Sequence, residues 1–177
     1  YDAGDPILLE TLRLAGAGFQ LQGSGQVDPD GENIPVALDA RLDADDLAVF
    51  AALAGRPLSG GLSADVALQA TLQDQAFDLS LDGSAQDLAL GIDQLDPLLR
   101  GGTLLELQAI RDSEGTRVPV LRIDNEAIDL TGDARITSEQ GEARIDLTVD
   151  NLGRIDPELA GPATVSFEAV NPGEAWQ

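Results

Sequence analysis

Apolar and polar residues alternate along most of this chain, and this period of two restricts the fold more than any other feature. Phe19, Leu21 and Val27 fall on one side of an extended strand, with Gln20 and Gln22 on the other. Successive side chains of a strand point to opposite faces of a sheet, so this pattern is typical of half-buried antiparallel strands. The alternation restarts after each turn almost to the end of the sequence. The sequence therefore predicts an all-β protein.

Three segments interrupt the alternation, and they resemble one another. They read LAGRPLSG at 53–60, IDQLDPLLRG at 92–101 and IDPELAG at 155–161, and each is a short apolar stretch that ends on a glycine. Glycine just past a short apolar segment is a common helix terminator. We therefore expect helical turns at three places, near 45–55, 92–100 and 154–160.

Repetition of this kind favours an extended array over a globule with one pocket. We treat residues 1–177 as a single segment of a longer array, and because the first residue is Tyr1 and not methionine we expect an internal piece of a larger protein. The repeat-like units run over about 12–60, 61–101, 102–161 and, as the start of the next unit, 162–177.

Charged residues on the polar side predict one strand register. Around the turn at 138–141, antiparallel pairing that sets Arg135 opposite Glu142 also sets Asp133 opposite Arg144. A shift by two residues would place like charges opposite each other, which is unfavourable.

Composition excludes several classes of function. The chain has 32 acidic and 10 basic residues, a formal net charge of −22, which repels nucleic acid and anionic membrane surfaces. It contains no Cys, His, Met or Lys, so the usual general base, thiol and amine nucleophiles and zinc ligands are missing. No segment approaches the roughly 18 apolar residues that a membrane-spanning helix needs. We expect no catalytic residue, no cofactor, no metal site and no enzyme activity.

The one-sided apolar pattern allows two architectures. Two sheets could interdigitate in a β-sandwich with a sealed core, although only four Phe are available and large aromatic residues normally anchor such packing. Alternatively, one sheet could curl into a trough. Roughly twelve strands spaced about 4.8 Å apart would make a trough about 60 Å long. Its apolar floor would exceed the roughly 300–600 Å² patch that a soluble monomer normally exposes, so it must meet a ligand or a partner.

Several stretches resemble a known family. LAGRPLSGGLSADVAL, ALGIDQLDPLLRGGTLLEL and NLGRIDPELAGPATVSF are similar to repeats of the TamB (translocation and assembly module) family and the wider AsmA-like group of bridge-like lipid carriers. FDLSLDGSAQDLALG and IDLTGDARIT match the strand pairs between those repeats, so the resemblance covers nearly the whole chain from about Leu12.

The resemblance implies a curled, mainly antiparallel, elongated sheet of the β-taco type with short helical inserts. It implies a periplasmic segment of an inner-membrane-anchored protein, with an Omp85-class outer-membrane partner bound through other parts of the full-length protein. The groove would conduct phospholipid acyl chains between the membranes, support outer-membrane protein assembly, or both. The alternative is a structural or adhesive envelope β-sandwich with a sealed core and no ligand.

The expected lining of the groove is the set of large apolar residues on the inner side of the alternation. It comprises Phe19, Leu21, Val36, Leu38, Leu62, Val66, Leu68, Leu72, Phe77, Leu79, Leu81, Leu105, Leu107, Leu121, Ile123, Ile128, Leu130, Ile136, Ile145, Leu147, Val149, Val165 and Phe167.

Overall fold

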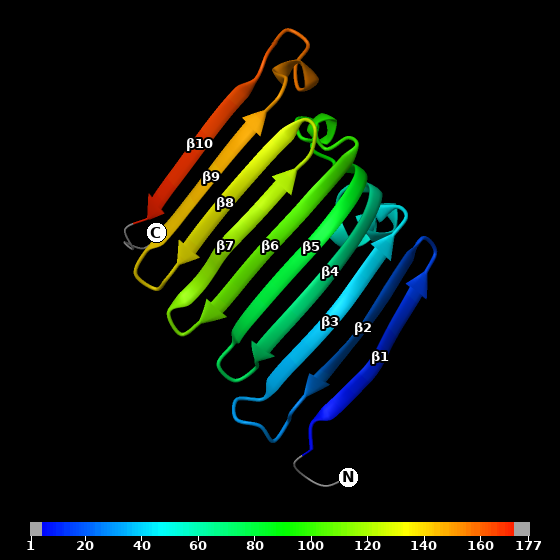
Figure 1. The fold of residues 1–177 in the computed structure, drawn as a ribbon, viewed down its shortest axis with the longest axis vertical. Helices are drawn as coiled ribbons and strands as arrows, with labels where there is room; N and C mark the ends of the chain where they lie inside the picture. The colour runs from blue at the N-terminus through cyan, green and yellow to red at the C-terminus, as the bar shows by residue number, and fades with distance from the viewer. Residues whose placement is uncertain (1–4, 172–177) are drawn as a thin grey trace.

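The computed structural model describes residues 5–171, which form one open antiparallel sheet of ten strands (Figure 1). Every strand pairs with its sequence neighbours, in the order β1 to β10. The strands are β1 (Ile7–Gly16), β2 (Phe19–Val27), β3 (Pro35–Ala44), β4 (Ser59–Thr71), β5 (Ala76–Ala89), β6 (Gly102–Asp112), β7 (Gly115–Asp124), β8 (Ile128–Ile136), β9 (Gly141–Val149) and β10 (Ala163–Asn171). The predicted all-β, curled antiparallel sheet is confirmed, with ten strands instead of roughly twelve.

The strand register gathers the apolar alternates on one face. Leu21 of β2 lies opposite Leu42 of β3, which lies opposite Ala64 of β4, and the same row continues across the sheet. Directly opposed residues of antiparallel strands point to the same side. We call this side the apolar face and the opposite side the outer face. The two-sheet sandwich that the alternation also allowed is not formed by the described residues.

The register predicted from the charges is confirmed. Asp133 lies opposite Arg144 and Arg135 opposite Glu142, across the β8–β9 hairpin. In these two cross-strand pairs of the outer face, an acidic residue therefore lies opposite an arginine, which avoids repulsion between like charges.

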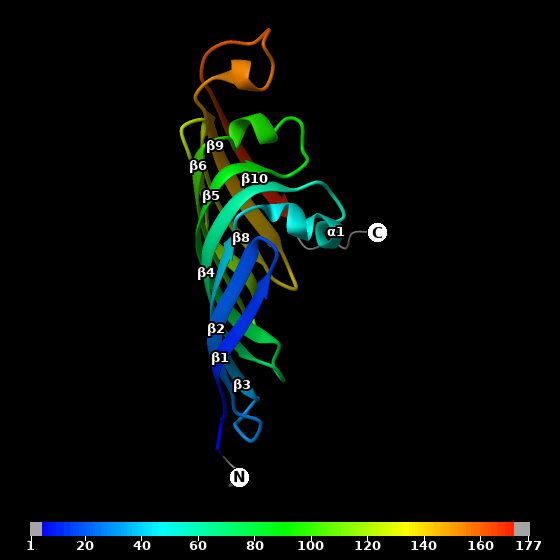
Figure 2. The same ribbon diagram turned by 90° about the vertical axis from the view of Figure 1, so that its right-hand side faces the viewer.

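The three interruptions form short helical inserts at one end of the sheet. They hold η1 (Leu47–Phe50) with α1 (Ala51–Ala54), η2 (Asp96–Leu98) and η3 (Leu152–Arg154). The first two lie within the predicted ranges 45–55 and 92–100, whereas the third shares only residue 154 with the predicted range 154–160. They follow β3, β5 and β9, and odd-numbered strands of a meander all end at the same end of the sheet. Figure 2 shows that the strands bow and that the inserts fold over the inner side of the bow.

The inserts cover a small core at this end of the apolar face. Leu98 and Leu99 of the second insert are 2% and 4% exposed, and they belong to the same buried cluster as Ala85, Ile128 and Val149 of the sheet. Among the described residues, Thr103 is the only buried polar one. Its hydroxyl accepts a hydrogen bond from Asn125. The described chain therefore has a closed core only where the inserts meet the sheet.

Asn125 connects the core to the β7–β8 turn. Its Nδ2 donates to the carbonyl oxygen of Leu98 at 2.9 Å and to Thr103 Oγ1 at 3.1 Å. Its Oδ1 accepts from the backbone N–H groups of Ala127 and Ile128. One side chain thus forms hydrogen bonds with polar groups of the insert, of β6 and of the turn, so these groups are buried without losing their hydrogen-bond partners.

Pro119 lies within β7, an internal strand, where a missing N–H would normally leave a gap in the ladder. β7 carries an extra residue here relative to both neighbours: the register shifts between Gln108 and Ile110 on one side and between Val118 and Leu121 on the other. A β-bulge is the usual place for proline inside a sheet. The bulge also returns Leu121 to the apolar face, opposite Leu107.

Asp96 holds the second insert in shape, and its loss should destabilise the protein. Its carboxylate accepts the backbone N–H groups of Leu90, Gly91 and Ile92 at 2.8, 3.1 and 3.2 Å. Replacing Asp96 with Ala leaves three donors without this acceptor, and we expect the free energy of unfolding to fall by about 1–3 kcal/mol in chemical denaturation. Asp93→Ala, at an exposed position of the same loop, is the control, and an equal loss in both variants would contradict this role.

Candidate functional site: an open apolar face

The apolar face beyond the inserts is not covered by any described part of the chain. Val36, Leu38, Val66, Leu68 and Leu79 lie there, and all are partly exposed. Residues of the same strands under the inserts, such as Ala44 and Ala85, are buried. We call the uncovered part the open face.

The predicted lining residues lie in several different environments. Most are paired within the strands on the apolar face, and those distant from the inserts line the open face. Ile128 and Val149, at 6% and 3% exposure, belong to the core under the inserts, so they do not line the open face as expected. The sequence predicted where the inserts occur along the chain but not which strands they cover, and that coverage decides this difference.

Further lining residues contact the core from its border, and one lies outside the strands. Phe19, Leu62, Leu105, Ile123 and Leu147 are partly buried against the core. Leu72 is in the β4–β5 turn and is 58% exposed, where it borders a depression shared with Leu68 and Phe77. At the C-terminal edge, Val165 and Phe167 are more than half exposed on the apolar face.

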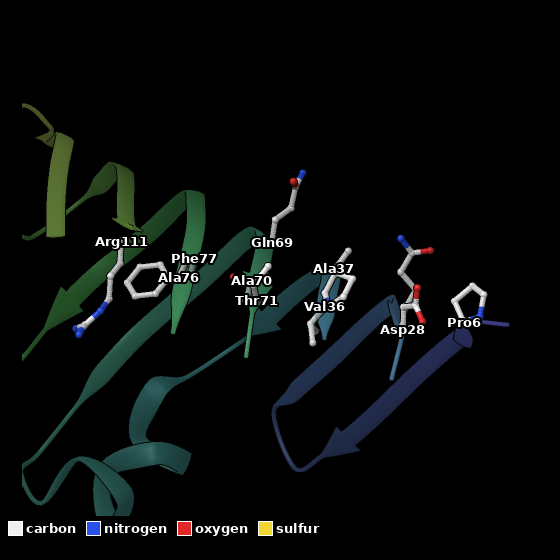
Figure 3. Close-up of a pocket in the computed structure, with 12 residues that line it drawn as sticks. Pro6, Asp28, Val36, Ala37, Gln69, Ala70, Thr71, Ala76, Phe77 and Arg111 are labelled. Atoms are coloured by element: carbon white, nitrogen blue, oxygen red, sulfur yellow. The ribbon is translucent and has the colours of Figure 1, made fainter. Parts of the chain in front are cut away.

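A shallow depression of about 550 Å³ lies at the end of the sheet opposite the inserts. Val36, Ala70, Phe77 and Arg111 of the apolar face line it together with Gln26, Ala37, Gln69 and Thr71 of the outer face, so it extends around this end of the sheet. Asp28 borders it from the β2–β3 loop. In Figure 3, Arg111 lies at one end of the row of lining residues and Pro6 at the other, with Asp28 beside Pro6 and Phe77 beside Arg111. Arg111 was not among the predicted residues, because the expected lining was a set of large apolar residues that ended on this strand at Leu107. The period of two, continued through Ala109, reaches Arg111.

The two lateral edges of the sheet are β1 and β10. β1 and β10 each pair with one neighbour only within residues 5–171, and both edges expose large apolar side chains such as Leu9 and Val170. Long apolar edge strands are a liability that natural sheets normally cover or pair. These edges can therefore accept further strands.

The outer face is charged and solvated. Arg41 binds Asp43 and Asp65 at 3.1 and 2.8 Å, and the Ser63 hydroxyl donates to Asp43 at 2.7 Å. That hydrogen bond, followed by the contact with Arg41, lowers the pKa of the Asp43 carboxyl below its usual value. Exposed pairs of this kind contribute little to stability individually. The outer face thus needs no partner to cover it.

Other kinds of site are not apparent in the described chain. Within residues 5–171, no group of three or more acidic side chains is placed to hold a metal ion. None of the helices described there is long and apolar enough to cross a membrane. No protein-family model matches the chain, and neither a curated protein nor a solved structure is significantly similar to it.

Proposed function

We propose that this chain is a segment of a periplasmic groove that carries phospholipid acyl chains between the inner and outer membranes. The observation that supports this proposal is the open face. Partly exposed apolar residues of neighbouring strands occupy it, such as Val36, Leu38, Val66, Leu68 and Leu79, and no described part of the chain covers them. A contiguous apolar surface across several strands marks a binding site on a protein in water, so it suits a hydrophobic occupant.

An acyl chain matches this surface energetically. A chain of about sixteen carbons gains roughly 13 kcal/mol on leaving water, at about 0.8 kcal/mol for each methylene. The middle of the open face is lined by Leu, Val, Ala and Gly, so no polar group fixes the chain at one point. A uniform apolar floor allows a bound chain to slide from strand to strand.

The proposal places the segment in an inner-membrane-anchored protein of the bacterial envelope, with an Omp85-class partner bound through other parts. The resemblance to TamB and AsmA-like repeats supports this placement, and so do the two sheet edges that can accept further strands. Assembly of outer-membrane proteins is a second use of the same groove, since an apolar client strand needs a similar surface. We propose neither a cofactor nor a catalytic step.

The structural alternative requires a covered apolar face. A sealed core would have to bury residues such as Leu68 and Leu79, yet the inserts bury only one end of the sheet. A ligand-free role would therefore need another protein to cover the open face.

Co-purification of lipid tests the proposal directly. We expect protein prepared without detergent to show phospholipid-sized mass additions in native mass spectrometry, and solvent extraction to recover the same lipid. Denaturation before measurement should remove the additions, which distinguishes bound lipid from covalent modification. Protein that is free of lipid and does not bind a fluorescent fatty acid would contradict the proposed function.

A further inference from the structure

Arg111 has a special position on the apolar face. It lies opposite Phe77 of β5 and Thr116 of β7, in the last row before the turns at the end opposite the inserts. Among the residues of β2 to β10 that are paired in the apolar rows, it is the only charged one. A cation at the end of an otherwise apolar floor is the arrangement that an amphiphile with an anionic headgroup requires.

Arg111 also lacks an anionic partner. Within the described part of the chain it forms no hydrogen bond or ion pair, whereas five arginines directed to the outer face each bind a carboxylate. Four other arginines form no ion pair either, but they lie in β1 or in the inserts: Arg13, Arg56, Arg100 and Arg154. With 32 acidic residues in the chain, an unpaired arginine on the apolar face is free to bind an external anion.

Carboxylates near Arg111 do not neutralise it from the apolar side. Asp78 and Asp112 follow Phe77 and Arg111 directly in their strands, so they point to the outer face, where Asp112 binds Arg117. Asp28 borders the same depression, but four strand spacings, about 19 Å along the sheet, separate it from β6. That separation exceeds the roughly 8 Å Debye length at physiological salt.

The dimensions suit one acyl chain directed toward the inserts. Leu68, Ala70, Leu72 and Phe77 line an apolar depression beside Arg111. From Phe77, about six residues of β5 lead to the inserts, about 20 Å at about 3.4 Å per residue. One acyl chain spans half of a bilayer's hydrocarbon core, about 15 Å. It therefore fits between the Arg111 end and the core.

We propose that Arg111 is an anion subsite at the rim of the open face, which binds the phosphate or carboxylate headgroup of a single-chain or two-chain amphiphile. The acyl chain lies over Phe77 and Leu68 and points toward the inserts. This inference rests on the proposed function, because it specifies the orientation and headgroup charge of a ligand in the same groove.

Equilibrium dialysis of two ligands with the same chain tests the subsite. A sixteen-carbon alkyl phosphate and the corresponding alcohol are compared at about 0.15 M salt, below the concentration at which the phosphate forms micelles. We expect the wild-type protein to bind the phosphate about three- to tenfold more tightly, as for a partly exposed charge-assisted hydrogen bond. Arg111→Gln should abolish this preference and leave affinity for the alcohol within about twofold. Arg13→Gln, which removes an unpaired arginine of β1, should retain it.

Each outcome separates the two proposals. If Arg111→Gln keeps the preference for the phosphate, or if the wild type has none, the subsite is wrong and the groove function stands. If inorganic phosphate alone at millimolar concentration displaces the alkyl phosphate from the wild type, the site is a simple anion site and the inference is overturned. If neither amphiphile binds the wild-type protein, the proposed groove function fails first.

Discussion

A carboxylate at Leu68 is expected to abolish acyl-chain binding while the protein remains folded. Leu68 lies in the middle of the open face, between Leu38 of β3 and Leu79 of β5, and it is partly exposed. Leu68→Asp places a charge on the floor, and covering that charge with an acyl chain costs several kcal/mol of desolvation. Without a ligand the new carboxylate still reaches water, so the sheet should persist. Binding of a fluorescent fatty acid and the thermal unfolding midpoint measure the two effects separately.

Gln69→Glu is the matched control, because it adds the same charge at the next residue, which is exposed on the outer face. We expect it to bind the fatty acid like the wild type. In the full-length protein, Leu68→Asp should block lipid passage and Gln69→Glu should not. Normal binding by a folded Leu68→Asp variant would exclude the open face as the lipid path.

The position of the charge relative to the inserts should decide whether function or folding is lost. Leu147 belongs to the same apolar face, but it packs against the core under the inserts. Leu147→Asp should therefore unfold the insert end of the sheet, an effect that Leu68→Asp avoids.

Truncation of Leu98 is expected to cause the largest loss of stability. This side chain is 2% exposed in the second insert and packs within the core cluster. Leu98→Ala removes buried methyl groups and leaves a cavity, which typically costs about 2–5 kcal/mol. Because the described chain has this one small core, a loss of that size is a large part of the roughly 5–15 kcal/mol by which domains are stable. Chemical denaturation of purified protein measures it.

Leu53→Ala is the corresponding control in the first insert, where the leucine is 88% exposed. We expect a change within about 0.5 kcal/mol. Equal effects of the two substitutions would mean that the inserts do not form a core with the sheet.

Much of the fold could be predicted from local pattern alone. The period of two is a property of the extended backbone, so the strands and their apolar side follow from the sequence. The Asp133–Arg144 and Arg135–Glu142 pairs were predicted because like charges opposite each other are unfavourable. The glycine-terminated apolar segments predicted the three helical inserts.

Whether the strands form one curled sheet or two packed sheets could not be predicted from the same pattern. Each strand of a sandwich and each strand of a trough has one apolar side, so alternation does not distinguish them. Only the tertiary structure shows a single meander, in which β3, β5 and β9 carry their inserts to the same end.

The sequence by itself determined which residues face inward, because side-chain direction along a strand is local. Tertiary structure decided which of them are covered. Val149 and Val66 occupy equivalent places in the alternation, yet an insert buries Val149 at 3% exposure and leaves Val66 partly open. It also decided that Arg111 ends an apolar row beside Phe77, since cross-strand neighbours are distant in the sequence. Coverage depends on where the inserts fold back, and that is a property of the whole sheet.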